Sequence, residues 1–129
     1  MNDFYKFLQE LINNNPELPN VNFSPLKDNV ESVSMRPMPS SPSSEFFDRE
    51  EITPIGVLFL SKRKYDADAS LDLEKIIREF TKMTDYPQPP EESGIQWITA
   101  TTGNTPSPVT QQSDGMKIYS CSLICLLNY

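Results

Sequence analysis

The residues of this sequence that are best suited to catalysis are two carboxylate pairs, Glu50–Glu51 and Glu91–Glu92. Paired carboxylates can serve as acid and base in hydrolysis when a rigid scaffold sets their separation. Both pairs stand beside segments that we expect to be flexible, where such a geometry is hard to hold. The chain contains no histidine, the usual base for proton transfer near neutral pH. We therefore expect a protein without catalytic activity or a cofactor. The alternative is a hydrolase that uses Glu50 or Glu91.

Two other groups of residues have the side chains of metal ligands. Asp66 and Asp68 alternate as in a calcium loop, but the glycine and terminal glutamate of that pattern are missing. We expect them, with Ser70, to be helix caps. Cys121 and Cys125 fall on one face of an expected strand about 13 Å apart, too far for a disulfide, and two thiols without histidine make a poor zinc site. The sequence thus predicts no metal site and two buried thiols.

The overall charge argues against a nucleic-acid-binding protein, and the apolar runs argue against a protein with membrane helices. The chain has 18 acidic and 11 basic side chains and a net charge of −7. The basic run 62–64 is followed at once by Asp66 and Asp68, so neither half of the chain resembles a phosphate-binding surface. The apolar runs 55–60 and 121–127 are far shorter than the roughly 20 residues of a membrane helix. The first residues also lack the features of a signal peptide. We expect a protein that is made and kept in a cytoplasm.

Periodicity along the chain predicts two helices and four strands. Apolar residues spaced by three and four predict helices, and apolar residues that alternate predict strands. A proline-rich connector over 16–29 should be anchored by Val21, Phe23 and Leu26. The expected elements are a helix over 4–12, strands over 30–37 and 52–61, a turn over 65–70, a helix over 71–84, and strands over 95–102 and 116–127.

The order of these elements, α-β-β-α-β-β, predicts an α+β fold. We expect a largely antiparallel four-stranded sheet with two helices packed on one face, in a single domain over 1–129. The strand over 52–61 has apolar residues on both faces, so it should be central. Polar, flexible hairpin loops are expected near 38–51 and 103–115.

Both loops are candidates for binding partners, because loops on a rigid sheet are where binding is usually placed. Two exposed arginines are candidates for ion pairs between subunits. The candidate residues are Phe46, Phe47, Arg49 and Glu50 in the first loop, Thr105, Val109, Gln111 and Gln112 in the second, and the arginines Arg36 and Arg78.

Several short strings, together with the element order, resemble one family over nearly the whole chain. The matching parts are the apolar helix 4–12, ESVSMRPMP at 31–39, PIGVLFLSK at 54–62, the helix 73–83 and KIYSCSL at 117–123. They resemble the minor capsid family of tailed bacteriophages, which is itself similar to the tail-terminator proteins of siphophages.

The resemblance implies a structural virion protein without catalysis. Such a protein forms a homo-hexameric ring on the end of the tail tube nearest the head, stops tube polymerisation and joins the tail to the head. It implies contacts with the tail tube protein and with a head-completion or connector protein. We expect it in the host cytoplasm during assembly, where the free subunit can be a monomer, and then in the virion. The acidic excess should let DNA pass the ring without specific binding. The alternative is a small cytosolic adaptor or inhibitor that acts as a monomer through the 45–51 loop.

Overall fold

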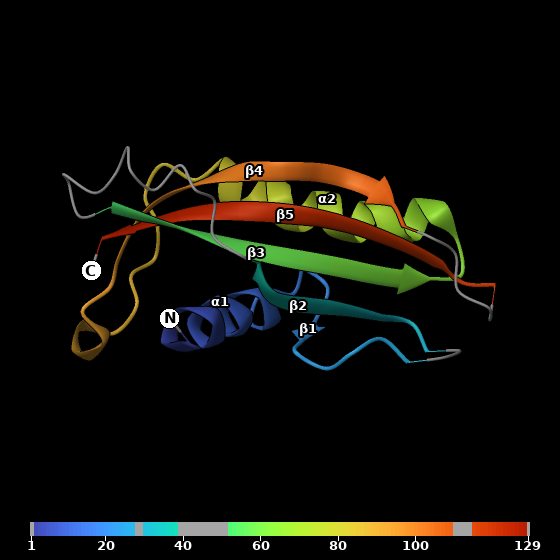
Figure 1. The fold of residues 1–129 in the computed structure, drawn as a ribbon, viewed down its shortest axis with the longest axis horizontal. Helices are drawn as coiled ribbons and strands as arrows, with labels where there is room; N and C mark the ends of the chain where they lie inside the picture. Colours follow the sequence, from blue (N-terminus) through green and yellow to red (C-terminus); the bar gives the residue numbers. More distant parts are fainter. Residues whose placement is uncertain (1, 28–29, 39–51, 110–114, 129) are drawn as a thin grey trace.

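The computed structural model describes residues 2–27, 30–38, 52–109 and 115–128. Two helices and a five-stranded mixed sheet make an α+β fold (Figure 1). The elements are helix α1 (Asn2–Asn13), strands β1 (Val21–Asn22), β2 (Ser32–Met38) and β3 (Ile52–Arg63), helix α2 (Asp66–Thr81), the 3-10 helix η3 (Glu91–Ser93), and strands β4 (Gln96–Pro108) and β5 (Lys117–Asn128).

The sheet has the strand order β1-β2-β3-β5-β4. The pairs from β2 to β4 are antiparallel, as the sequence predicted, whereas β1 runs parallel to β2. The prediction of four strands was therefore wrong by one short edge strand. A strand of two residues is too short to show any alternation, so no local pattern indicates it. Val21 in β1 is buried as expected, but Phe23 is 42% exposed and does not anchor the connector.

Strand β3 is central, as its two apolar faces predicted. All 12 of its residues are in register with β5, from Ile52 opposite Asn128 to Arg63 opposite Lys117. On its other side it pairs with β2, where Pro37 lies beyond the two residues that β1 covers. Pro37 therefore has no strand beside it on that edge among the described residues, and an edge is the position in a sheet that proline tolerates.

Helix α1 ends where the asparagines begin, as its apolar stripe predicted. Phe4, Leu8 and Ile12 are fully buried on one side. The last residue, Asn13, binds β1 with both ends of its side-chain amide: its Nδ2 donates to the Val21 carbonyl (3.1 Å), and its Oδ1 accepts from the Val21 N–H (2.7 Å). The tyrosine at position 5 reaches the sheet, where its hydroxyl donates to the Gly56 carbonyl at 3.1 Å. These bonds fix α1 against β1 and β3.

Helix α2 begins at Asp66, five residues before the predicted start, so the expected turn over 65–70 is helical. Tyr65 occupies the N-cap position without a side-chain hydrogen bond. Asp66 and Asp68 stand in the first turn rather than capping it, where negative charge stabilises the helix dipole. Ala69 is fully buried and gives this turn an apolar contact. The sequence prediction failed because aspartate and serine favour caps and turns as well as first turns.

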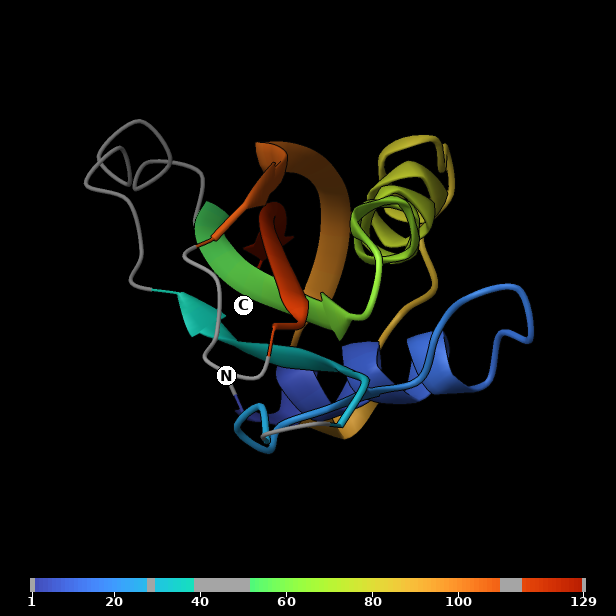
Figure 2. The same ribbon diagram turned by 90° about the vertical axis from the view of Figure 1, so that its right-hand side faces the viewer.

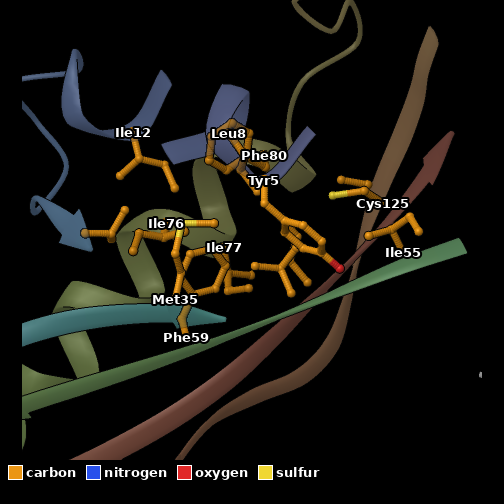
Figure 3. Close-up of a cluster of buried hydrophobic side chains, with 14 of the residues drawn as sticks. Tyr5, Leu8, Ile12, Met35, Ile55, Phe59, Ile76, Ile77, Phe80 and Cys125 are labelled. Carbon is orange, nitrogen blue, oxygen red and sulfur yellow. The ribbon is translucent and has the colours of Figure 1, made fainter. Parts of the chain in front are cut away.

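Both helices pack on the same face of the sheet, as predicted. Figure 2 looks nearly along the strands and shows α1 and α2 on one side of the curved sheet. In Figure 3, side chains from both helices meet Met35, Ile55, Phe59 and Cys125 of the sheet. Trp97 lies at one end of this core, 2% exposed, with ring contacts to Phe4, Phe7, Phe80 and Tyr86.

Strand β4 is longer than the sequence predicted. It continues through Pro108, so 103–108 is strand and not the start of the expected loop. Its register with β5 shifts at three places, the last two between Thr102 and Ser107. Gly103 allows the close approach: a Cβ on it would lie 2.3 Å from Ser122 Oγ and 3.3 Å from the Ile124 side chain. The polar composition of 103–108 suggested a loop, but an irregular edge strand tolerates such residues.

Candidate interaction surfaces

The structure places only one of the two carboxylate pairs that the sequence singled out. No three histidine, cysteine, aspartate or glutamate side chains within them gather in a way that could hold a metal ion. Glu91 and Glu92 are both exposed in η3; the other pair, Glu50–Glu51, lies outside the described residues. None of the described helices is long and apolar enough to span a membrane.

Both cysteines are free and buried in the core, as the sequence predicted. Burial raises the pKa of the Cys121 thiol from 9.0 to about 12 and also raises the pKa of Cys125. A thiolate is the reactive form of cysteine, so both side chains serve packing and not nucleophilic chemistry at neutral pH.

A polar network joins the C-terminal end of β3 to the start of α2. Asp72 is 8% exposed and accepts a hydrogen bond from Ser61 Oγ at 3.0 Å. The Arg63 Nε lies 3.6 Å from a carboxylate oxygen of Asp72 and 3.6 Å from one of Glu31. Lys62 is fully buried, and its Nζ donates to the Lys27 carbonyl at 2.8 Å. The Arg63 Nε forms no hydrogen bond, but its two ion pairs and the Ser61–Asp72 hydrogen bond connect the helix to the sheet, so the network is structural.

The sheet face away from the helices carries a group of aliphatic side chains, which we call the outer apolar patch: Leu58, Leu60, Ile124 and Leu126. All four are half-buried. The register places them along a diagonal line across the two strands: Leu58, opposite Ser122, is the diagonal neighbour of Ile124, and Leu60 and Leu126 extend the line at its two ends. The side chains of diagonal neighbours across a strand pair are close enough to touch. In Figure 2 both helices lie on the other side of the sheet, and Gly103 of β4 approaches Ser122 and Ile124 closely.

A groove of about 520 Å³ lies between α2 and the connector that follows α1. We call it the α2 groove. The wall on α2 carries Lys75, Arg78 and Lys82, spaced so that all three lie on the helix side away from the core. Pro16 and Leu18 form an apolar wall on the connector. The remaining lining residues are Glu17 and Glu79, so cationic side chains outnumber anionic ones in this groove.

A second groove, of about 340 Å³, lies beside the N-terminal part of α1 and η3. We call it the α1 groove. Its charged residues are Asp3, Glu10 and Glu92 against the single cation Lys6. Phe7 and Pro90 supply apolar surface. This groove therefore has the opposite balance of charge from the α2 groove.

Four of the predicted site residues can be placed. Arg36 is exposed and pairs in register with Leu58, so it lies on the same sheet face as the outer apolar patch. Arg78 lines the α2 groove. Thr105 is exposed in β4, and Val109 is 42% exposed just after it. The structure does not bring Arg36 and Arg78 together with the second loop's residues in one site. The other six, Phe46, Phe47, Arg49, Glu50, Gln111 and Gln112, lie outside the described residues.

Sequence reasoning missed the partners of Arg78 in the α2 groove. Lys75 and Lys82 join Arg78 there because the connector folds back beside α2, and its wall at Pro16 and Leu18 is distant in sequence. The outer apolar patch did have a signal, since Leu58 and Leu60 alternate with the core residues of β3. Comparison of the chain with protein-family models and with curated proteins finds no match.

Proposed function

We propose that this protein is a structural subunit of a tailed bacteriophage. It forms a ring on the end of the tail tube nearest the head, ends tube polymerisation and provides the surface that joins the tail to the head. The resemblance of its helices and of the strings at 31–39, 54–62 and 117–123 to the minor capsid family supports this role.

The observation that carries the proposal is the outer apolar patch. Its four aliphatic side chains each keep part of their surface exposed, in a line across the sheet, and exposed apolar surface of this kind is used in protein–protein contacts. Here the patch stands on β3 and β5, the two most extensively paired strands of the sheet. A rigid surface loses little conformational freedom on binding, which suits a permanent virion contact.

Polar residues flank the patch on both sides. Arg36 of β2 lies opposite Leu58, and Thr101 of β4 lies opposite Ile124; Arg36 and Thr101 are both exposed. An apolar centre with a polar rim is the usual anatomy of a protein interface. We assign this face to the contact with the tail tube, whose end is the surface that a terminating ring must cover.

The decisive experiment is electron microscopy of virions assembled without the protein. We expect tails of irregular, excessive length, detached from heads. Tails of normal length, joined to heads, would refute the proposal.

A patch variant connects this phenotype to the structure. Ile124→Asp places a charge in the patch and should give the same overlong tails, whereas Glu74→Gln, on the exposed side of α2, should not. Circular dichroism of the purified variants confirms that both remain folded. If folded Ile124→Asp protein still gives tails of normal length, the patch is not the tube contact. A protein that instead binds one soluble partner as a monomer, and leaves tails unchanged, would be an adaptor or inhibitor.

A further inference from the structure

The two grooves have opposite charge and lie on one subunit, and we infer that they bind each other between copies. In this contact the α2 groove of one copy receives the acidic side of α1 and η3 from a second copy. The occupant of the α2 groove is thus another molecule of this same chain.

The cationic side of the contact has unbalanced charge. Lys75, Arg78 and Lys82 form no ion pair with any other described residue. Arg78 and Lys82 also stand four positions apart on one helix face, where like charges destabilise a helix. In a chain of net charge −7, this groove keeps an excess of one positive charge, because Glu17 and Glu79 offset only two of its three cations. An anionic partner in the groove would relieve this repulsion.

The α1 groove is complementary to the α2 groove in charge and also carries apolar surface. Asp3, Glu10 and Glu92 form no ion pair within the described part of the chain. Phe7 is half-buried beside them, and the facing groove offers the exposed Pro16 as an apolar counterpart. Charge complementarity of this kind sets the register and the partner of an interface.

The positions of the two grooves determine the type of assembly. The α1 groove lies beside the N-terminal part of α1, near η3, whereas the α2 groove begins after the C-terminal end of α1 (Figure 1). Because the two surfaces differ, each copy can bind one neighbour through each groove. Such head-to-tail contacts generate a closed ring or an open filament and not a two-fold dimer. Closure into a ring rests on the proposed function; the contact itself does not.

Two charge-reversal variants test the contact, each read by sedimentation and light scattering over rising protein concentration. We expect the wild-type protein to self-associate at low salt and less so as salt is added, since exposed charges are screened. Lys75→Glu/Arg78→Glu and Glu10→Lys/Glu92→Lys should each weaken association at least about tenfold. Lys27→Glu, an exposed lysine that lines neither groove, should associate as the wild type does.

Mixing the two variants is the sharper test. Each retains one native groove, and their reversed grooves are again complementary, so an equimolar mixture should recover wild-type association. No recovery on mixing, or unchanged association of either variant alone, would overturn the contact. A wild-type protein that stays monomeric up to millimolar concentration would overturn it as well. Failure of the proposed function is separate, because it appears as normal tail length in virions whatever the purified protein does.

Discussion

The strongest stability prediction concerns Trp97, the single tryptophan of the chain. Its ring is 2% exposed, and the centroids of four other rings lie within 6.5 Å of it. Two of these rings come from α1, one from α2 and one from the segment that leads to η3. Trp97→Ala therefore removes the side chain on which three parts of the chain pack.

The expected loss of unfolding free energy is about 3–5 kcal/mol, the usual cost of truncating a buried tryptophan to alanine. We expect the upper part of this range, because each aromatic pair adds about 0.5–1.5 kcal/mol beyond the burial of its area. Since small domains are stable by only about 5–15 kcal/mol, the variant should be folded but marginal. The edge-on contact with Phe4, with ring centroids 5.3 Å apart, is the main tie to α1.

The assay is urea unfolding followed by far-ultraviolet circular dichroism, because the variant has no tryptophan to report by fluorescence. The control is Ile98→Ala at the next position, where the side chain is 38% exposed and the expected loss is below about 1 kcal/mol. Equal losses for the two variants, or a loss below about 1 kcal/mol for Trp97→Ala, would refute the assignment of Trp97 as the centre of the aromatic core.

Three further predictions concern buried polar groups. Burial raises the pKa of Cys121 to about 12 and also raises the pKa of Cys125, so these thiols ionise first in the unfolded chain. The unfolding free energy should therefore fall as pH rises above about 9. The double variant Cys121→Ala/Cys125→Ala should show a shallower fall when unfolding by urea is measured over the same alkaline range. Asp72→Ala should lower the unfolding free energy by about 1–3 kcal/mol in urea, since Arg63 and the Ser61 hydroxyl both lose the Asp72 carboxylate as a partner. An unchanged unfolding free energy would show that the network does not hold α2. Ser122→Ala should be neutral or stabilising, because the buried Oγ has no hydrogen-bond partner among the described residues, and a loss above about 1 kcal/mol in a thermal melt would contradict this.

The parts of the fold that the sequence predicted well are those with long, regular apolar periods. Phe4, Leu8 and Ile12 define α1, and the alternation around Val57 and Phe59 defines β3 and its central place. In each case burial requires the pattern that the sequence shows. The parts that failed are those in which tertiary contacts override local preference. Val21 pairs with Val33 in a strand of two residues, and no local pattern indicates this.

The surfaces were predicted only in part, for a related reason. Arg78 could be recognised as outward-facing from its helix alone. Its groove could not, since the facing wall at Pro16 and Leu18 depends on how the connector folds back. Arg36 was expected at a subunit contact, and its place beside the outer apolar patch follows from the pairing of β2 with β3. A single helix or strand shows which residues face outward, but not which outward residues share a surface.

The place of β5 in the sheet has a consequence for synthesis of the protein. This strand, formed last along the chain, is inserted between β3 and β4, and it contributes Leu123, Cys125 and Leu127 to the core. Until residues 117–128 have left the ribosome, β3 can pair only with β2, and β4 lacks β5, the one strand with which it pairs in the described sheet. The fold is thus completed after translation of this strand, by pairing of distant segments, a topology that folds slowly. During that interval the nascent chain needs protection from aggregation.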